Sequence, residues 1–113
     1  MEKAYLLVRV VISDREAYAE YMRHTPRIIA AHGGRMIVRG GDVTTLEGPK
    51  ENHRLVIIEF PSIEAAQNFY QSEAYQKAKN LRQGAGDAQF VLVEGYAEET
   101  WQQAVAESQS EGA

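Results

Sequence analysis

The chain has 113 residues, a formal net charge of -4 and no cysteine. Its length fits one domain of ordinary size, and a hydrophobic content of 44% is enough to build a core. The absence of cysteine excludes disulfides, thiolate zinc sites and iron–sulfur clusters, and the acidic balance argues against binding to nucleic acid or to an acidic membrane surface.

The first apolar segment, Ala4 to Ile12, is rich in Val, Leu and Tyr and predicts a strand. It is too short to span a membrane and lacks a small-residue cleavage site, so we expect a cytoplasmic protein without a signal peptide. Ser13, with Glu16 three residues later, predicts a capping box and the start of a helix. An apolar stripe at helical spacing continues to the glycines at 33–34, and Pro26 predicts a kink or a break within that helix.

The downstream pattern predicts three further strands and a second helical region. Ser62 and Ser72 are expected helix caps, so this region should break at Ser72 and resume to about Arg82. A loop is expected over residues 83–88, and the tail over residues 108–113 is expected to be disordered. The other expected elements are strands at Arg35–Arg39, Arg54–Phe60 and Phe90–Tyr96, an extended arm at Val43–Glu47, and a terminal helix at Glu98–Glu107 around Trp101.

The order β-α-β-β-α-β predicts an α+β domain of the ferredoxin-like type, with a four-stranded antiparallel sheet. Right-handed crossovers place the strands in the order 4-1-3-2, counted along the chain. We expect this domain to cover residues 1–97, and residues 98–113 to form a C-terminal helix and a flexible tail.

The strands are apolar on both faces. In the first strand Leu6 and Val8 point to one side, and Leu7 and Val11 point to the other. Two helices cover only one face of such a sheet, and large exposed apolar patches are uncommon on monomers. The pattern therefore predicts a homodimer through the sheet face. The alternative is a monomer whose C-terminal segment folds over the sheet.

Several sequence blocks together resemble domain-of-unknown-function family 1330, over about residues 3 to 96. The resemblance implies the dimeric α+β barrel fold, in which two ferredoxin-like sheets pack face to face. It implies no activity, although the wider superfamily includes cofactor-free monooxygenases, muconolactone-type isomerases and haem-degrading enzymes. The blocks are HGGRMIVRGG (32–41), LEG (46–48), RLVIIEFPS (54–62), Phe69-Tyr70-x-Ser72-x-x-Tyr75, Arg82 and VEG (93–95).

The predicted topology gathers basic side chains at one end of the sheet. Guanidinium groups bind carboxylates or phosphates in bidentate geometry, so a cluster of them predicts an anion pocket. The alternative is a set of structural ion pairs with Asp42, Glu47, Asp87 or acids of a partner chain. The residues expected at this end are Arg9, Arg39, Arg54 and Arg82, with His53 beside them.

Other side chains are candidates for handling protons or for binding a ligand. His24 is a candidate general base or a surface histidine, and Glu59 is a candidate buried acid or an ion-pair partner of Arg35 or Lys3. His32 is expected to cap or pack the helix end. Among the tyrosines, Tyr70 is a candidate proton donor or acceptor, and Tyr18, Tyr21 and Tyr75 are candidates for lining a ligand cleft or for core packing.

We expect no metal and no cofactor, because no local spacing of metal ligands and no haem motif occurs. The leading functional hypothesis is the binding, with or without conversion, of a small organic acid or carbonyl compound between the helices and the sheet. The alternatives are a non-catalytic ligand-sensing or structural dimer module and a haem-binding or haem-degrading barrel.

Overall fold

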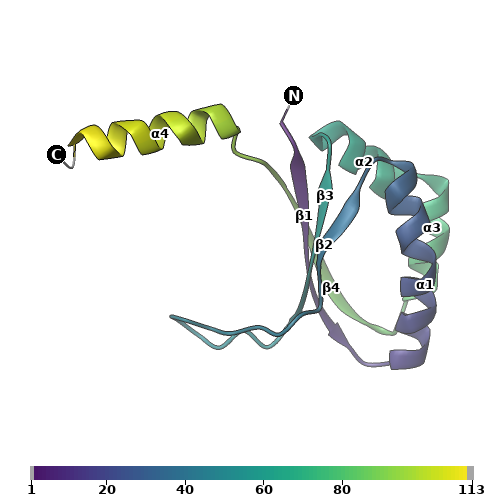
Figure 1. Cartoon of the computed structure of the whole chain (residues 1–113). Coiled ribbons are helices and arrows are strands. Elements are labelled where there is room, and N and C mark those ends of the chain that lie inside the picture. The colour runs from purple at the N-terminus through teal and green to yellow at the C-terminus, as the bar shows by residue number, and fades with distance from the viewer. Residues whose placement is uncertain (1, 112–113) are drawn as a thin grey trace.

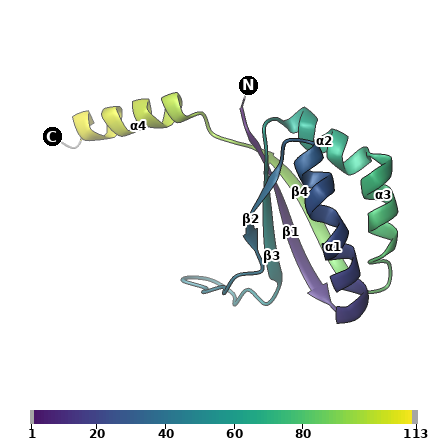
Figure 2. The ribbon, with the colours of Figure 1, turned by 45° about the vertical axis from the view of Figure 1, so that its right-hand side comes forward.

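A four-stranded antiparallel sheet carries helices on one face, as Figures 1 and 2 show. The computed structural model describes residues 2–111. Among these residues, no helix has the length and apolar character needed to cross a membrane. The elements in chain order are β1 (Ala4–Ile12), α1 (Arg15–Ala31), β2 (Arg35–Arg39), β3 (Arg54–Phe60), α2 (Ile63–Gln71), α3 (Glu73–Asn80), β4 (Gly86–Glu94) and α4 (Glu98–Glu111).

The strands lie in the order β2-β3-β1-β4, and every neighbouring pair is antiparallel. This order confirms the predicted ferredoxin-like topology. The central strand β1 pairs over its length with β4 and along most of it with β3. We call the face that α1, α2 and α3 cover the covered face, and the opposite face the open face.

The first helix starts one residue later than predicted, because Asp14 and not Ser13 caps it. The Asp14 carboxylate accepts a hydrogen bond from the Ala17 amide at 3.1 Å. The backbone amides of both Ser13 and Asp14 donate to the carbonyl of Ala85, at 2.8 and 3.0 Å, so Ser13 belongs to the turn that closes the sheet end. The capping box at Ser13 was therefore wrong.

The two later caps are confirmed. The Ser62 hydroxyl accepts from the Ala65 amide at 3.0 Å, and the Ser72 hydroxyl accepts from the Tyr75 amide at 3.1 Å. Ser72 ends α2 and begins α3, so the second helical region breaks where its sequence predicts.

Helix α1 passes through Pro26 without a break. Proline lacks an N–H, so the carbonyl four residues earlier, at Met22, has no backbone donor from Pro26. Two side chains donate to that carbonyl instead: the Thr25 hydroxyl at 3.4 Å and the Arg39 guanidinium at 3.1 Å. The predicted break is absent, and the freed carbonyl links α1 to the end of β2.

Strand β4 begins at Gly86, four residues before the predicted start at Phe90. Gly86 pairs with Ile12, and a Cβ at position 86 would collide with the carbonyl of Val11. The predicted loop over 83–88 was therefore too long. Helix α3 ends at Asn80, and α4 continues to Glu111, so residues 108–111 are helical where disorder was predicted. Residues 112–113 lie outside the described residues.

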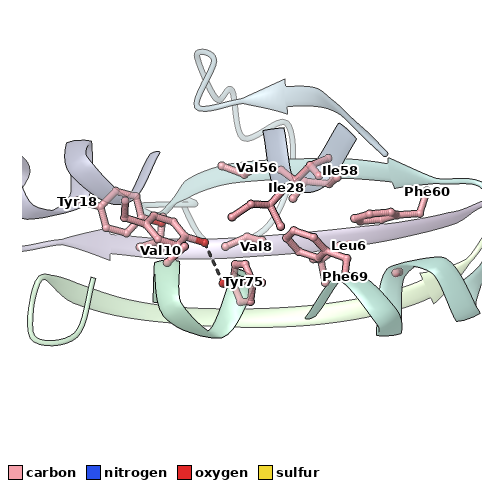
Figure 3. Close-up of a cluster of buried hydrophobic side chains, with 14 of the residues drawn as sticks. Leu6, Val8, Val10, Tyr18, Ile28, Val56, Ile58, Phe60, Phe69 and Tyr75 are labelled. Carbon is pink, nitrogen blue, oxygen red and sulfur yellow. Dashed lines mark hydrogen bonds between the residues drawn. The ribbon is translucent and has the colours of Figure 1, made fainter. Parts of the chain in front are cut away.

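The core fills the space between the covered face and the helices (Figure 3). Aromatic rings dominate its centre: Phe69 lies 5.2 Å from Phe60 and 4.7 Å from Tyr75, measured between ring centroids. A carbonyl only accepts, so Nδ1 of His32 donates to the Ile28 carbonyl at 2.9 Å, as a helix cap should, and the ring meets Phe69 edge-on.

The open face is apolar and lacks cover by the described residues. Its exposed aliphatic side chains include Leu7, Val11, Val91 and Val93, which are 38–51% exposed. Helix α4 and the loop over residues 41–53 project on this side, at opposite ends of the strands (Figure 1). The alternative to the dimer, a C-terminal segment folded over the sheet, is not seen, since α4 points away from the sheet and Trp101 is 58% exposed.

Candidate functional site

A pocket of about 560 Å³ opens at the end of the sheet where β1 ends and β3 begins. We call it the arginine pocket and this end of the molecule the arginine end. The pocket is lined on its polar side by Arg15, Tyr18, Met22, Gly40, His53 and Arg54. These residues come from α1, from the segment after β2 and from the start of β3.

A β-bulge in β2 turns Arg39 toward this site. Arg35 pairs with Glu59 on the open face, and the register shifts at Ile37 between Met36 and Val38. Because side chains alternate along a strand, the extra residue moves Arg39 to the covered face. Its guanidinium donates to the carbonyl of Met22.

Arg54 lies on the same face, and its position requires a glycine opposite. A Cβ at Gly40 would collide with the Arg54 guanidinium, and Gly40 also has a positive φ of 70°. The Arg54 Nη2 group lies 3.5 Å from the sulfur of Met22. Arg39 and Arg54, two of the four arginines expected at this end, therefore meet at Met22.

A second network surrounds Arg82. Its Nη2 group donates to the hydroxyl of Tyr75 at 3.3 Å, and that hydroxyl is 2.9 Å from the hydroxyl of Tyr21. Figure 3 marks the tyrosine pair with a dashed line. The guanidinium carbon also lies 4.9 Å from the centroid of Phe90 and 5.4 Å from that of Tyr21. Aromatic faces and hydroxyls, rather than a carboxylate, surround this cation.

The Arg54 and Arg82 side chains share an unusual property. The Nε–H groups of both are buried and have no hydrogen-bond partner among the described residues. No carboxylate within residues 2–111 forms a salt bridge with either side chain. Buried polar groups are normally hydrogen-bonded, so each of these groups calls for an acceptor.

Tyr18 lies close to both cations. Burial raises the pKa of the Tyr18 phenol, while the positive charges of Arg82 and Arg54 oppose that rise. Burial and the neighbouring Tyr75 raise the pKa of Tyr21 still further. Both phenols therefore keep their protons at neutral pH. The Tyr18 hydroxyl can donate a hydrogen bond to a ligand, and the Tyr21 hydroxyl is hydrogen-bonded to Tyr75.

Arg9 lies apart from the other three arginines, on the open face. It pairs with Glu51 at 2.7 Å, and the same carboxylate lies 3.2 Å from Nδ1 of His53. The hydrogen bond from Arg9 lowers the pKa of Glu51 to about 2. For Arg9 the ion-pair alternative applies, with an acid of the loop over residues 41–53.

Glu59 sits at the opposite end of the sheet, also on the open face. Its carboxylate lies 3.3 Å from Arg35 and 3.6 Å from Lys3, which confirms the predicted ion pairs. Burial raises its pKa, but the contacts with Arg35 and Lys3 outweigh burial and lower the pKa overall. Glu59 is an ionised structural residue far from the arginine pocket.

His24 and Tyr70 also lie outside the arginine pocket. His24 contacts Glu20 at 3.0 Å on the outer side of α1, where it lines a groove between α1 and α3 with Lys77. Tyr70 lines a separate pocket of about 320 Å³ beside β4, and its hydroxyl accepts from Lys79 at 3.1 Å. Its ring is 5.2 Å from that of Tyr75, so it borders the Arg82 network from the far side.

For two residues that line the pocket, His53 and Arg15, the sequence predicted no role of their own in binding or catalysis. His53 was placed near the arginines, and the structure adds that Glu51 orients its ring at the pocket wall. Arg15 opens α1, where a cation opposes the helix dipole. That unfavourable position is a signal in the sequence that could have marked Arg15 as a candidate pocket residue.

The described residues contain no group of three or more His, Asp or Glu side chains placed to hold a metal ion. The polar groups that the arginine pocket presents are instead guanidiniums, a phenol, an imidazole and the amide of Asn52. Such groups suit a ligand with a carboxylate or a carbonyl oxygen.

The sequence and fold can be compared with known proteins. The sequence model of the family described as Domain of unknown function (DUF1330) matches residues 3–96. No curated protein matches the chain in sequence. A protein of unknown function from Rhodopseudomonas palustris, RPA0582, is similar in structure, with a TM-score of 0.69 and 24% identity over 85% of this chain and 84% of that one.

Two more distant structures share the fold. SnoaB from Streptomyces nogalater, a cofactor-independent oxygenase, has a TM-score of 0.62 and 11% identity, covering 86% of this chain and 96% of its own. A dimeric protein of unknown function with a ferredoxin-like fold, from Bacteroides fragilis, has a TM-score of 0.51 and 12% identity, covering 82% and 96%. At these identities the likeness establishes the ferredoxin-like fold alone.

Proposed function

The chain belongs to the family described as Domain of unknown function (DUF1330), whose description assigns no activity, and from its geometry we propose that it binds a small organic acid in the arginine pocket. The carboxylate would lie against Arg54, with Arg15 and Arg39 adding positive charge at the rim. The Tyr18 hydroxyl would donate a hydrogen bond to a carboxylate or carbonyl oxygen.

The observation that carries this proposal is the unpaired state of Arg54. Its buried Nε–H has no acceptor among the described residues, and Gly40 leaves room for its guanidinium at the pocket wall. A structural arginine with a buried guanidinium nitrogen normally has an acceptor for it, and even the more exposed Arg9 on the other face has a carboxylate partner in Glu51. An organic carboxylate supplies the missing partner in the planar, two-bond geometry that guanidinium prefers.

The pocket's size limits the ligand. Ligand sites of about 300 to 1,000 Å³ hold drug-sized molecules, and the arginine pocket, at about 560 Å³, falls within that range. Apolar side chains, among them Val10 and Ile12, share the lining with the polar groups, including Asn52. We therefore favour an acid with a short aliphatic or aromatic body over a fully hydrophilic one.

Thermal-shift screening of small carboxylic acids tests the proposal. A ligand at a hundredfold its dissociation constant adds about 2.7 kcal/mol to the free energy of unfolding. Arg54→Gln should weaken binding about tenfold or more, because a hydrogen bond between charged groups contributes about 1.5–3 kcal/mol. Arg9→Gln, the same change on the open face, is the control and should leave affinity within about twofold, below the ~1.4 kcal/mol of a tenfold change.

No shift with any acid, or equal losses in the two variants, would remove the arginine pocket as the binding site. If Arg54→Gln proves too unstable, Arg54→Lys keeps the charge and loses the planar pair of donors. This second variant should bind more weakly than the wild type, in keeping with the geometry proposed for Arg54.

One observation favours conversion of the ligand as well as binding. His53 lines the pocket, and Glu51 holds Nδ1 of its ring at 3.2 Å. An imidazole oriented by a carboxylate is a suitable general base near neutral pH. A 2-oxo acid bound at Arg54 should then exchange its C3 hydrogens with D₂O, as followed by proton NMR, and His53→Gln should abolish the exchange without abolishing binding. Exchange that persists in His53→Gln would assign the base elsewhere.

The proposal includes a second copy of the chain on the open face. Support comes from its exposed aliphatic residues, such as Leu7 and Val91, and from the dimeric state of the structurally similar Bacteroides fragilis protein. Two such faces, related by a two-fold axis, would cover each other. Sedimentation velocity should give a dimer, and Val91→Asp should give a folded monomer. A wild-type monomer at micromolar concentration would contradict this part of the proposal.

A further inference from the structure

Helix α4 lies outside the matched family region and carries an apolar stripe that the rest of the described chain leaves largely uncovered. Trp101 is 58% exposed, and Ala104 and Val105, which lie three and four residues further on, share its side of the helix. Every charged residue of α4 is acidic, including Glu98, Glu99 and Glu107. An acidic helix with an exposed tryptophan of this kind suits an apolar surface with basic neighbours.

The direction and length of α4 show how far it reaches. It leaves the sheet after β4 and projects past the open face, away from α1, α2 and α3 (Figures 1 and 2). Its 14 residues make a helix about 21 Å long, at about 1.5 Å per residue. Two sheets packed face to face lie only about 10 Å apart. On a second copy seated against the open face, α4 therefore extends beyond that copy's sheet to the level of its helices.

The two ends of the sheet differ in charge. Helix α4 starts beside Lys3, because the Gly95 amide donates to the Lys3 carbonyl at 2.7 Å. At the opposite, arginine end, Asp14 caps α1 and Glu51 is paired with Arg9 and His53. Glu16, Asp42, Glu47 and Asp87 add four acidic groups there. The cations at that end without a salt bridge to the described residues are Arg15, Arg39, Lys50, Arg54 and Arg82.

A two-fold axis between the sheets can run along the strands or across them. If it ran along the strands, both acidic α4 helices would lie at the same end of the dimer, where their charges repel. If it runs across the strands, each α4 lies beside the arginine end of the other copy. The second arrangement is therefore favoured, because it separates the two acidic helices and brings each of them near arginines that have no salt bridge within the described residues.

We propose that α4 is an arm that docks across the arginine end of a second copy, so that Trp101 and Val105 cover the rim of that copy's arginine pocket. The inference rests on the second copy proposed above, and it assigns part of each ligand site to the partner. It explains why an exposed tryptophan and an all-acidic helix occur together on a projecting segment. The ligand pocket would then be complete only in the dimer.

Photo-crosslinking tests the placement of α4. The chain has no cysteine, so Ala104→Cys can be labelled at one position with a maleimide benzophenone. Dimers mixed from ¹⁴N and ¹⁵N chains distinguish crosslinks between copies from crosslinks within one chain by mass spectrometry. Gln103→Cys places the same label on the opposite side of α4 and is the matched control.

We expect crosslinks between copies from position 104 to residues 10–18, 39–54 or 82–87, and far fewer from position 103. Crosslinks within one chain only, crosslinks to the partner's end at residues 2–5 or 94–97, or equal yields from the two positions would each overturn the proposal. Trp101 is the single tryptophan, so its emission gives a second, label-free measurement. It should shift to the red when the dimer is diluted, and an emission independent of protein concentration would also overturn the proposal.

The outcomes separate this inference from the proposed function. Crosslinks in the expected segments without any carboxylate-induced thermal shift would support the arm and contradict ligand binding. A thermal shift that depends on Arg54, without crosslinks between copies, would do the reverse. A chain that sediments as a monomer would contradict both the second copy and the arm.

Discussion

The two faces of the sheet are built from the same strands and differ in how their charges are paired. On the open face, Arg9 is paired with Glu51 and Glu59 is paired with Arg35 and Lys3, among exposed aliphatic side chains. On the covered face, Arg82 lies among aromatic rings and Arg54 lies against Met22, and neither has a carboxylate partner within the described residues.

This difference separates two roles. Where Arg9 and Glu59 are neutralised in ion pairs among aliphatic side chains, the surface can be buried without leaving these charges unpaired. Such a surface suits assembly with a second copy. Half-buried cations whose buried N–H groups have no acceptor gain from a ligand of opposite charge, which suits recognition of an anion. The following predictions test whether the faces divide their roles in this way.

The largest effect is expected from neighbouring leucines on opposite faces of β1. Leu6 is 5% exposed in the core and Leu7 is 38% exposed on the open face. Leu6→Ala should lower the free energy of unfolding by about 2–5 kcal/mol, because the change leaves a cavity. Measured by urea denaturation, this loss should be the same at low and high protein concentration, because Leu6 lies in the core and not on the open face.

Leu7→Ala is the matched variant and should cost less. Its effect should appear mainly as a weaker dimer, so the unfolding midpoint should depend differently on protein concentration than in the wild type. Equal and concentration-independent losses in the two variants would show that the open face is not an interface.

A smaller effect is expected from removing one hydroxyl of the Arg82 network. Tyr75→Phe leaves the Tyr21 hydroxyl and the Arg82 Nη2 group without their acceptor or donor partner, which should cost about 1–3 kcal/mol of unfolding free energy. Tyr70→Phe removes a hydroxyl that contacts only the Lys79 side chain and should cost less than about 0.5 kcal/mol, as for exposed polar contacts. A larger loss in Tyr70→Phe than in Tyr75→Phe would show that the Tyr70 hydroxyl, and not the Arg82 network, contributes more to stability.

The ion pair between Arg9 and Glu51 on the open face should affect how the free energy of unfolding depends on pH under acidic conditions. The pKa of Glu51 falls from 4.5 to about 2 on folding, so its contribution is fully present above pH 4.5 and is lost as pH falls toward about 2. Glu51→Gln and Arg9→Gln should each make stability less steeply dependent on pH within that window, as measured by urea denaturation at a series of pH values. An unchanged slope in both variants would mean that the pair does not form in solution.

The smallest effect is expected at His24. It contacts Glu20 on the outer side of α1, away from the arginine pocket. His24→Ala should leave carboxylate affinity and any proton exchange within about twofold of the wild type, well under the ~1.4 kcal/mol of a tenfold change. A loss similar to that of His53→Gln would move the site to the groove between α1 and α3.

Much of the architecture was readable from local pattern. Strands β1, β2 and β3 have their predicted bounds, and Ser62 and Ser72 cap the helices that follow them. The predictions were wrong where the local structure depends on hydrogen bonds to a segment distant in the sequence. Ser13 lost its capping role to Asp14 because its amide bonds to Ala85, and β4 starts early because Gly86 pairs with Ile12.

The alternation of apolar residues and the order of the elements determined, by themselves, the sheet topology, its two apolar faces and the gathering of basic residues toward one end. Only the tertiary structure decided which face each arginine occupies. One extra residue at Ile37 sends Arg39 to the covered face, while Arg9, on a regular strand, stays on the open face beside Glu51. A bulge forms in response to the neighbouring strand and to what the side chains meet across it, and neither is contained in the local sequence.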